Sequence, residues 1–185
     1  TYEGERLVNT TQVNYVDPLD RKQILEADQE LRHQMNIITD FLRKYVPGYE
    51  HCTIKTGAST LGIRESRRFS GKYVMNISDL REARRFPDVV VHKAQFVVDI
   101  HNPVGGGQAN GIAEYVDAYD IPWRSLVPQK MENLILAGRC ISGTHEAMAS
   151  YRVMAIAMAI GEAAGIGAAL AIDHDVTPEN LDVKY

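Results

Sequence analysis

This 185-residue sequence contains few cysteines and few aromatic residues, and neither sign of charge is in large excess. Cys52 and Cys140 are too few for a disulfide scaffold, and no CxxC pair indicates a zinc or iron–sulfur site. Twenty Lys and Arg against 24 Asp and Glu leave a formal net charge of −4, so no broad basic field exists to bind nucleic acid. We therefore expect a cytoplasmic protein with reduced thiols, no metal site and no nucleic-acid partner.

The first residues lack both an initiator methionine and the pattern of a signal peptide. Residues 1–6 contain neither a basic region nor an apolar region of the kind that secretion requires. The apolar fraction of 45% is ordinary for a globular core, and the length suits one domain or one domain plus part of another. We interpret the chain as a segment of a longer protein.

The first 130 residues mix helix and strand patterns, which predicts an α+β fold. Apolar residues at steps of three, four and seven predict an amphipathic helix over 18–46, with Asp17 as its N-cap and Pro47-Gly48 as its stop. Ser78 is expected to cap a short helix over 79–86. Short β-branched runs predict strands at 7–16, within 52–76, at 89–91, at 96–100, and near 115–127, where Pro122 and Pro128 confine a strand to an edge or an end. We expect an antiparallel sheet within 7–128 that carries the 18–46 helix on one face.

The last third has a different character. The run 134–137 is wholly apolar, as in a buried strand, and 151–172 is a long helix in which eleven of 22 residues are Ala or Gly. Its length would suffice to cross a bilayer, but Glu162 within it and Arg152 at its start would be costly in lipid. We expect no membrane partner. The row Ala157, Gly161 and Gly165 predicts instead a close packing face, against the sheet or a second copy of the chain in a homo-oligomer.

The segment between this strand and this helix has the features of a ligand site. The strand ends in Gly138-Arg139, where glycine permits close backbone approach, and Ser150 is positioned to cap the long helix. The free backbone N–H groups near Arg152 and Val153 would then point at an electron-rich ligand. The alternatives are simple strand-to-helix packing for Gly138 and a surface ion pair for Arg139.

Several motifs in one order resemble the FAD-dependent oxidoreductases called xanthan-lyase-like, which are distantly similar to the flavin subunit of heterodisulfide reductase. The resemblance covers roughly residues 5–173. Its C-terminal motifs are Asn133-Leu-Ile-Leu-Ala-Gly-Arg-Cys-Ile-Ser-Gly-Thr-His-Glu-Ala, Ser150-Tyr-Arg-Val-Met and Gly161-Glu-Ala-Ala-Gly. Its upstream motifs are Ile63-Arg-Glu-Ser-Arg-Arg, Gly71-Lys-Tyr-Val, Arg84-Arg-Phe-Pro-Asp, Val98-Asp-Ile-His-Asn-Pro and Ile121-Pro-Trp-Arg.

The resemblance implies an FAD cofactor, with the start of the last helix at the N1/C2-oxygen edge of the isoalloxazine ring. The residues it implies for cofactor binding are Gly138, Arg139, Ser150, Arg152, Val153 and Met154. The GxGxxG motif that seats the FAD pyrophosphate is missing, since Gly105-Gly106-Gly107 has the wrong spacing. We therefore expect residues 1–130 to be a substrate or cap domain and 131–185 the C-terminal segment of an FAD-binding domain. On its own, this piece should bind FAD weakly or not at all and should be inactive.

Candidate catalytic residues lie on the substrate side. Asp99 and His101 are two apart in a predicted strand and so face the same way, which suits a general acid/base whose tautomer a carboxylate fixes. His145, in the loop before the last helix, is the second candidate. Arg124 is a third, because an arginine fork suits an anionic small-molecule substrate. Structural roles remain open for all four, and the clusters at 64–68 and 81–85 can equally be salt-bridged surface.

Two other functions remain open beside a flavin oxidoreductase. A non-catalytic binding or interaction module is favoured by the missing GxGxxG motif. A carbohydrate lyase is disfavoured, because such an enzyme needs a pair of carboxylates at a cleft and the sequence offers no compelling pair.

Overall fold

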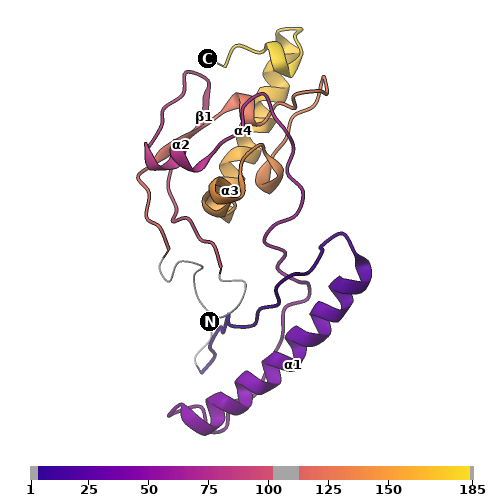
Figure 1. Cartoon of the computed structure of the whole chain (residues 1–185), viewed down its shortest axis with the longest axis vertical. Helices are drawn as coiled ribbons and strands as arrows, with labels where there is room; N and C mark the ends of the chain where they lie inside the picture. Colours follow the sequence, from indigo (N-terminus) through magenta and orange to yellow (C-terminus); the bar gives the residue numbers. More distant parts are fainter. Residues whose placement is uncertain (1–3, 102–112, 184–185) are drawn as a thin grey trace. The chain divides into compact units, whose positions relative to one another are not determined.

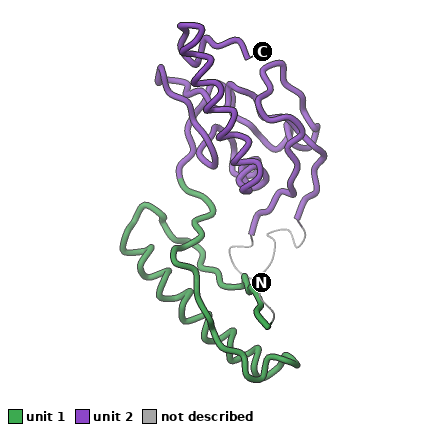
Figure 2. The backbone as a smooth tube through the Cα atoms, turned by 180° about the vertical axis from the view of Figure 1, so that it is seen from behind, with its two compact units in different colours: residues 1–66 green, residues 67–185 purple. Residues whose placement is uncertain are grey.

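The computed structural model describes residues 4–101 and 113–183, which fall into two compact units, 1–66 and 67–185 (Figure 2). The elements are helices, short 3-10 helices and a two-stranded antiparallel sheet (Figure 1). The α+β class expected from the sequence is confirmed.

The first unit is built on one long helix, α1, which spans Arg21–Tyr45. Asp20 is its N-cap, because the Asp20 carboxylate accepts a hydrogen bond from the backbone N–H of Lys22. The predicted cap at Asp17 is wrong, since the Asp17 carboxylate accepts from Leu19 N–H in the turn that precedes the helix. The helix ends before Pro47-Gly48, as expected. The strand predicted at 7–16 does not form over the described residues of that range.

The second unit contains the sheet. Strand β1 (Val89–Ala94) pairs antiparallel with β2 (Tyr119–Pro122). This confirms the strand predicted from residue 89. The second strand ends at Pro122, as expected for a proline. The register shifts within β1, where Lys93 has a φ of 55°. Such an irregularity leaves the backbone N–H of Lys93 outside the ladder. This N–H donates a hydrogen bond to Asp120 Oδ1 at 3.1 Å.

The antiparallel sheet expected within 7–128 forms from β1 and β2 alone among the described residues, and the other strands predicted there are wrong. Over the described residues, the segments 52–76, 96–100 and 134–137 are extended or irregular, and only isolated bridges occur there, such as Met75 with Gly143 and Val98 with Glu114. The apolar run 134–137 is likewise held by an isolated backbone hydrogen bond, in which Leu136 N–H donates to Leu126 O at 2.7 Å. The runs at 96–100 and 134–137 therefore gave extended segments that bury Val98 and Leu136 in the core without joining a ladder.

Three helices complete the second unit. Helix α2 (Ile77–Arg81) is capped by Asn76, not by Ser78, and starts two residues earlier than predicted. The long C-terminal pattern divides into α3 (His145–Tyr151) and α4 (Met154–Asp173). Helix α4 packs against β1 and against two 3-10 helices, η2 (Gly138–Cys140) and η3 (Pro178–Asn180). The remaining 3-10 helix, η1 (Trp123–Ser125), follows β2 directly.

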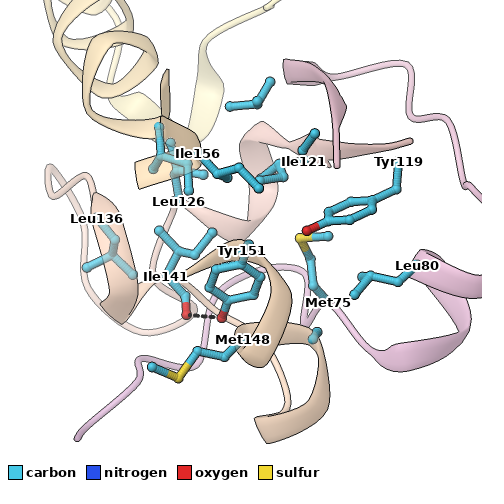
Figure 3. Close-up of a cluster of buried hydrophobic side chains, with 14 of the residues drawn as sticks. Met75, Leu80, Tyr119, Ile121, Leu126, Leu136, Ile141, Met148, Tyr151 and Ile156 are labelled. Carbon is cyan, nitrogen blue, oxygen red and sulfur yellow. Dashed lines mark hydrogen bonds between the residues drawn. The ribbon is translucent and has the colours of Figure 1, made fainter. Parts of the chain in front are cut away.

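A single buried cluster joins these elements (Figure 3). Met75 and Tyr119 contribute from before residue 130, and Tyr151 and Ile156 contribute from after it. Within the cluster, the Tyr151 hydroxyl donates to the backbone oxygen of Ile141 at 3.2 Å (Figure 3). The two compact units are defined by packing alone, so the functional division at residues 130 and 131 stays a prediction.

Helix α4 is buried along a different face from the one predicted. Its buried positions are Ile156, Ile160, Gly167 and Ala171. Gly161 and Gly165, from the predicted small-residue row, are exposed. The glycine that packs closely is Gly167, because a Cβ at that position would overlap the ring of Trp123. By length and composition α4 could cross a membrane, and 22% of its most apolar window is buried in the structure.

Candidate functional site

The candidate site is centred on the break between α3 and α4. Arg152 ends α3 with its backbone N–H donating to Met148 O, and Val153 is the extended N-cap of α4. No side chain of the described residues caps α4. Its first free backbone donors are therefore those of the turn that begins at Met154, a residue with an exposed fraction of 83%.

Two details predicted at this helix start are wrong. Ser150 does not cap the long helix, because it lies inside α3 and its hydroxyl donates to Phe96 O at 2.7 Å. The buried hydroxyl of Tyr119 lies 2.8 Å from Ser150 Oγ, and burial raises the pKa of Tyr119 to about 12. The backbone N–H of Arg152 is likewise bound within α3 and does not point outward. Continuous helical periodicity across 151–153 concealed the break.

Residues 96–101, which we call the strap, run along the last turn of α3. Three hydrogen bonds join the strap to the end of α3: Ser150 Oγ donates to Phe96 O, Asp99 N–H donates to Ala149 O at 3.4 Å, and Arg152 Nη2 donates to Asp99 O at 2.7 Å. The strap therefore carries its polar side chains to the break between α3 and α4.

Asp99 and His101 lie side by side on the strap, as their spacing predicts. His101 Nε2 is 3.2 Å from Asp99 Oδ2, and the His101 and Asp99 side chains keep exposed fractions of 32% and 17%. Arg152 Nη2 lies 3.7 Å from the same carboxylate oxygen. The structure thus brings together a predicted acid/base pair and a predicted cofactor residue that are about fifty positions apart in sequence. The catalytic role of the pair stays a prediction.

His145 lies at the other end of α3. It is the first residue of that helix and is exposed, about 9 Å along the axis from Tyr151. The side chain of the neighbouring Glu146 accepts hydrogen bonds from its own backbone N–H and from the side chain of Thr144. These hydrogen bonds lower the pKa of Glu146. His145 therefore shares the capped start of α3, whereas His101 pairs with Asp99, which contacts Arg152 just before α4.

Arg124 has a carboxylate partner of its own. Its Nε and Nη2 bind the two oxygens of Asp88 at 2.8 and 3.0 Å, and its backbone N–H binds Asp88 Oδ2 at 3.1 Å. Burial alone would raise the pKa of Asp88, but these bonds outweigh burial and lower it. This geometry is that of a structural ion pair, and substrate binding by Arg124 stays a prediction.

The arginines of the 81–85 cluster form salt bridges, which is the surface role that the sequence left open beside substrate binding. The pairs are Arg81 with Glu114, Arg84 with Asp79 and Glu82, and Arg85 with Asp120. In the neighbouring cluster, Arg68 Nε donates to Gly143 O at 2.9 Å. These contacts fix loops to the core and occupy the guanidinium groups involved.

Gly138 and Arg139 lie in η2, beside α4. Gly138 has a φ of 73°, and a Cβ there would meet nothing within 4 Å. Backbone conformation, rather than close packing, therefore requires glycine at this position. Arg139 is exposed. Binding of a cofactor by these two residues stays a prediction.

Sequence reasoning missed the side-chain contact between Arg152 and Asp99. The two residues are 53 positions apart, and neither periodicity nor motif spacing relates them. The resulting arrangement has a definite chemical capacity. An imidazole paired with a carboxylate can exchange a proton, and Arg152 links this pair to the N-cap of α4, a helix start whose donors favour an electron-rich ligand.

Searches of curated proteins and of solved structures found no match to this chain. A family model described as FAD dependent oxidoreductase matches residues 1–185. The chain therefore belongs to the family of FAD-dependent oxidoreductases.

Proposed function

We propose that this chain supplies the substrate side and the flavin-facing helix of an enzyme that transfers two electrons between a small molecule and FAD. One observation carries this proposal. Arg152 contacts Asp99 and directly precedes the N-cap of α4, so the acid/base pair and the uncapped helix start belong to one site. Family membership supplies the cofactor class.

The uncapped start of α4 fits the electron-rich edge of a flavin. When bound, FAD accepts or donates the electron pair of the reaction. The first turn of α4 offers free N–H groups and the positive end of a 20-residue helix. Such donors stabilise the negative charge of a reduced flavin more than the neutral oxidised ring, and so raise its reduction potential. Gly138 and Arg139 are then expected beside the ribityl chain or the pyrophosphate.

In this proposal His101 handles the proton of the reaction. Oxidation of a carbon by loss of hydride requires a proton to leave a neighbouring hydroxyl, amine or carbon. The imidazole of His101 accepts that proton, and Asp99, at 3.2 Å, stabilises the imidazolium that forms. The exposed fraction of 32% leaves room for a substrate to reach the ring.

The rest of the cofactor site lies, in our proposal, outside these 185 residues. The sequence lacks GxGxxG, so the pyrophosphate is expected to bind a βαβ unit elsewhere in the parent protein. Residues 131–185 would be the last part of that FAD-binding domain, of the xanthan-lyase-like type. The exposed apolar residues Met154, Met158 and Ile172 on α4 would pack against its remaining part or against a second copy.

A non-catalytic binding module is the second candidate. The missing GxGxxG motif favours it for the isolated chain. In that case the Asp99–His101 pair would be structural, and replacing His101 would not affect any redox reaction.

The proposal is tested by anaerobic stopped-flow reduction of the flavin in the parent protein, with a small molecule that reduces the wild type. His101→Ala should retain its flavin and slow reduction by ~10²–10⁴-fold. The matched control is His145→Ala, which changes a histidine at the other end of α3. Equal rates for wild type and His101→Ala would contradict the proposal, and a slowed His145→Ala beside them would transfer the role to His145.

A further inference from the structure

We propose that Arg152 is a positioning residue that orients His101 through Asp99, an inference that rests on the proposed function. Arg152 Nη2 donates to the backbone oxygen of Asp99 at 2.7 Å and lies 3.7 Å from its Oδ2. The same Oδ2 lies 3.2 Å from His101 Nε2. One carboxylate oxygen therefore faces both the guanidinium and the imidazole.

Burial shows which member of this cluster fixes the others. The exposed fraction of the side chain rises from 11% at Arg152 to 17% at Asp99 and 32% at His101. A guanidinium so far from water requires an acceptor and a counter-charge, and Asp99 supplies both. The planar guanidinium and the backbone contact restrict how the carboxylate can turn. The more exposed imidazole is then oriented by a carboxylate that is already fixed.

The position of Arg152 in the chain gives this contact its significance. The strap is held by three bonds from the end of α3, and the bond from Arg152 is the one nearest to His101. Arg152 is followed directly by Val153, the N-cap of α4. Arg152 therefore ties the acid/base pair to the first turn of the helix that we assign to the flavin.

The contact also determines which ring nitrogen can act as the base. With Nε2 directed at Asp99, the neutral imidazole of His101 donates its N–H to the carboxylate and keeps its lone pair on Nδ1. We infer that Nδ1 accepts the substrate proton. Loss of the guanidinium would remove one of the contacts that orient Asp99, and the ring would be held less firmly by its carboxylate partner.

Proton-detected NMR of the flavin-free chain, labelled with ¹⁵N-histidine, tests this inference. In the wild type the Nε2–H of His101 should be protected from exchange with water. In Arg152→Gln the exchange of the His101 Nε2–H should accelerate about tenfold or more, because the Asp99 carboxylate is held less firmly as its acceptor. Arg152→Lys keeps the charge and one donor and should restore part of the protection. The control is Arg32→Gln, which removes an exposed Arg on α1 that pairs with Asp28.

Unchanged protection in folded Arg152→Gln would overturn the positioning role, whatever the flavin experiments show. If Arg152→Gln does not fold, the variants Arg152→Lys and Asp99→Asn serve in its place. Both should accelerate the exchange of the His101 Nε2–H with water. Wild-type protection in both variants would overturn the positioning role. The proposed function fails separately. Loss of protection in Arg152→Gln beside wild-type flavin reduction by His101→Ala would support the positioning contact and contradict the catalytic role.

Discussion

At the scale of single residues, Asp120 shows how this fold uses a buried charge. Its side chain is 3% exposed, and its Oδ1 binds Arg85 Nη1 at 2.6 Å, His92 Nδ1 at 3.0 Å and the N–H of Lys93 at 3.1 Å. Burial alone would raise the pKa of Asp120, but the bonds to Lys93 and Arg85 outweigh it and lower the pKa. The ionised carboxylate thus holds the irregular part of β1 to β2.

The lowered pKa predicts that acid destabilises the second unit. Because the folded-state pKa lies below the unfolded value of about 3.9, the contribution of Asp120 is present above that value and is lost as pH falls through the folded pKa. Asp120→Asn should lower the free energy of unfolding at neutral pH by about 1–3 kcal/mol. It should also lose less stability than the wild type on acidification.

Urea unfolding at neutral pH and near pH 3 measures both effects. The control is Asp28→Asn on α1, where the pair with Arg32 is exposed and its loss should cost under about 0.5 kcal/mol. An equal effect of the two substitutions would show that Asp120 is not a structural charge.

Residue spacing predicted part of the candidate site. The alternation of side chains along an extended segment placed Asp99 and His101 together correctly, although the segment is not a ladder strand. No such rule relates either residue to Arg152. Their contact depends on how the strap crosses α3, which is decided by the packing of the core.

At the scale of elements, periodicity located the long helices, but of the predicted strands only those near 89 and Pro122 form among the described residues. The helices α1 and α4 obey a strong local preference, so their patterns identified them to within a few residues. Their ends depend on which of several polar residues caps best, and Asp20 displaced Asp17. Strands need a partner along their length: the run near 54 stays exposed, and the runs near 98 and 135 pack on the core with at most an isolated bridge.

The buried face of α4 gives a prediction with a matched control. A Cβ at Gly167 would overlap the ring of Trp123, which is buried and donates its Nε1–H to Pro178 O at 2.8 Å. Gly167→Ala should therefore destabilise the protein by about 1–3 kcal/mol. Gly161→Ala meets nothing within 4 Å and should stabilise it by about 0.5–1 kcal/mol, because alanine favours the helix.

Thermal unfolding of the two variants checks this prediction. A stabilised Gly167→Ala would show that α4 does not pack on Trp123. A destabilised Gly161→Ala would show that the exposed face of α4 is already covered in the chain, as the original small-residue prediction had it.

At the scale of the whole molecule, the second unit has a well-formed core, and its helix α4 leaves large apolar side chains exposed. The buried cluster of the second unit joins its sheet to α3 and α4, whereas Met154, Met158 and Ile172 on α4 are exposed. The mixture of helix and strand patterns along the chain predicted the α+β class, which the structure shows. It did not predict the division at 66 and 67, since that boundary depends on long-range packing rather than on a change in residue types.

We predict that the 185-residue chain alone binds FAD weakly or not at all. Without a GxGxxG motif it lacks the principal anchor for the pyrophosphate. Titration with FAD, followed by flavin fluorescence, tests this. Sub-micromolar stoichiometric binding would place the whole cofactor site within these residues, contrary to our proposal.

The proposed function depends most on the first turn of α4 facing the flavin, and a reduction potential tests this placement without knowledge of the substrate. In the flavin-loaded parent protein, Met154→Glu places a carboxylate at that turn. The control, Ile172→Glu, changes a residue of similar exposure about 27 Å along the helix. A carboxylate near the reduced ring should cost about 1 kcal/mol and lower the two-electron potential by roughly 20 mV in Met154→Glu, with no change in Ile172→Glu. Equal potentials in wild type and both variants would contradict the central claim.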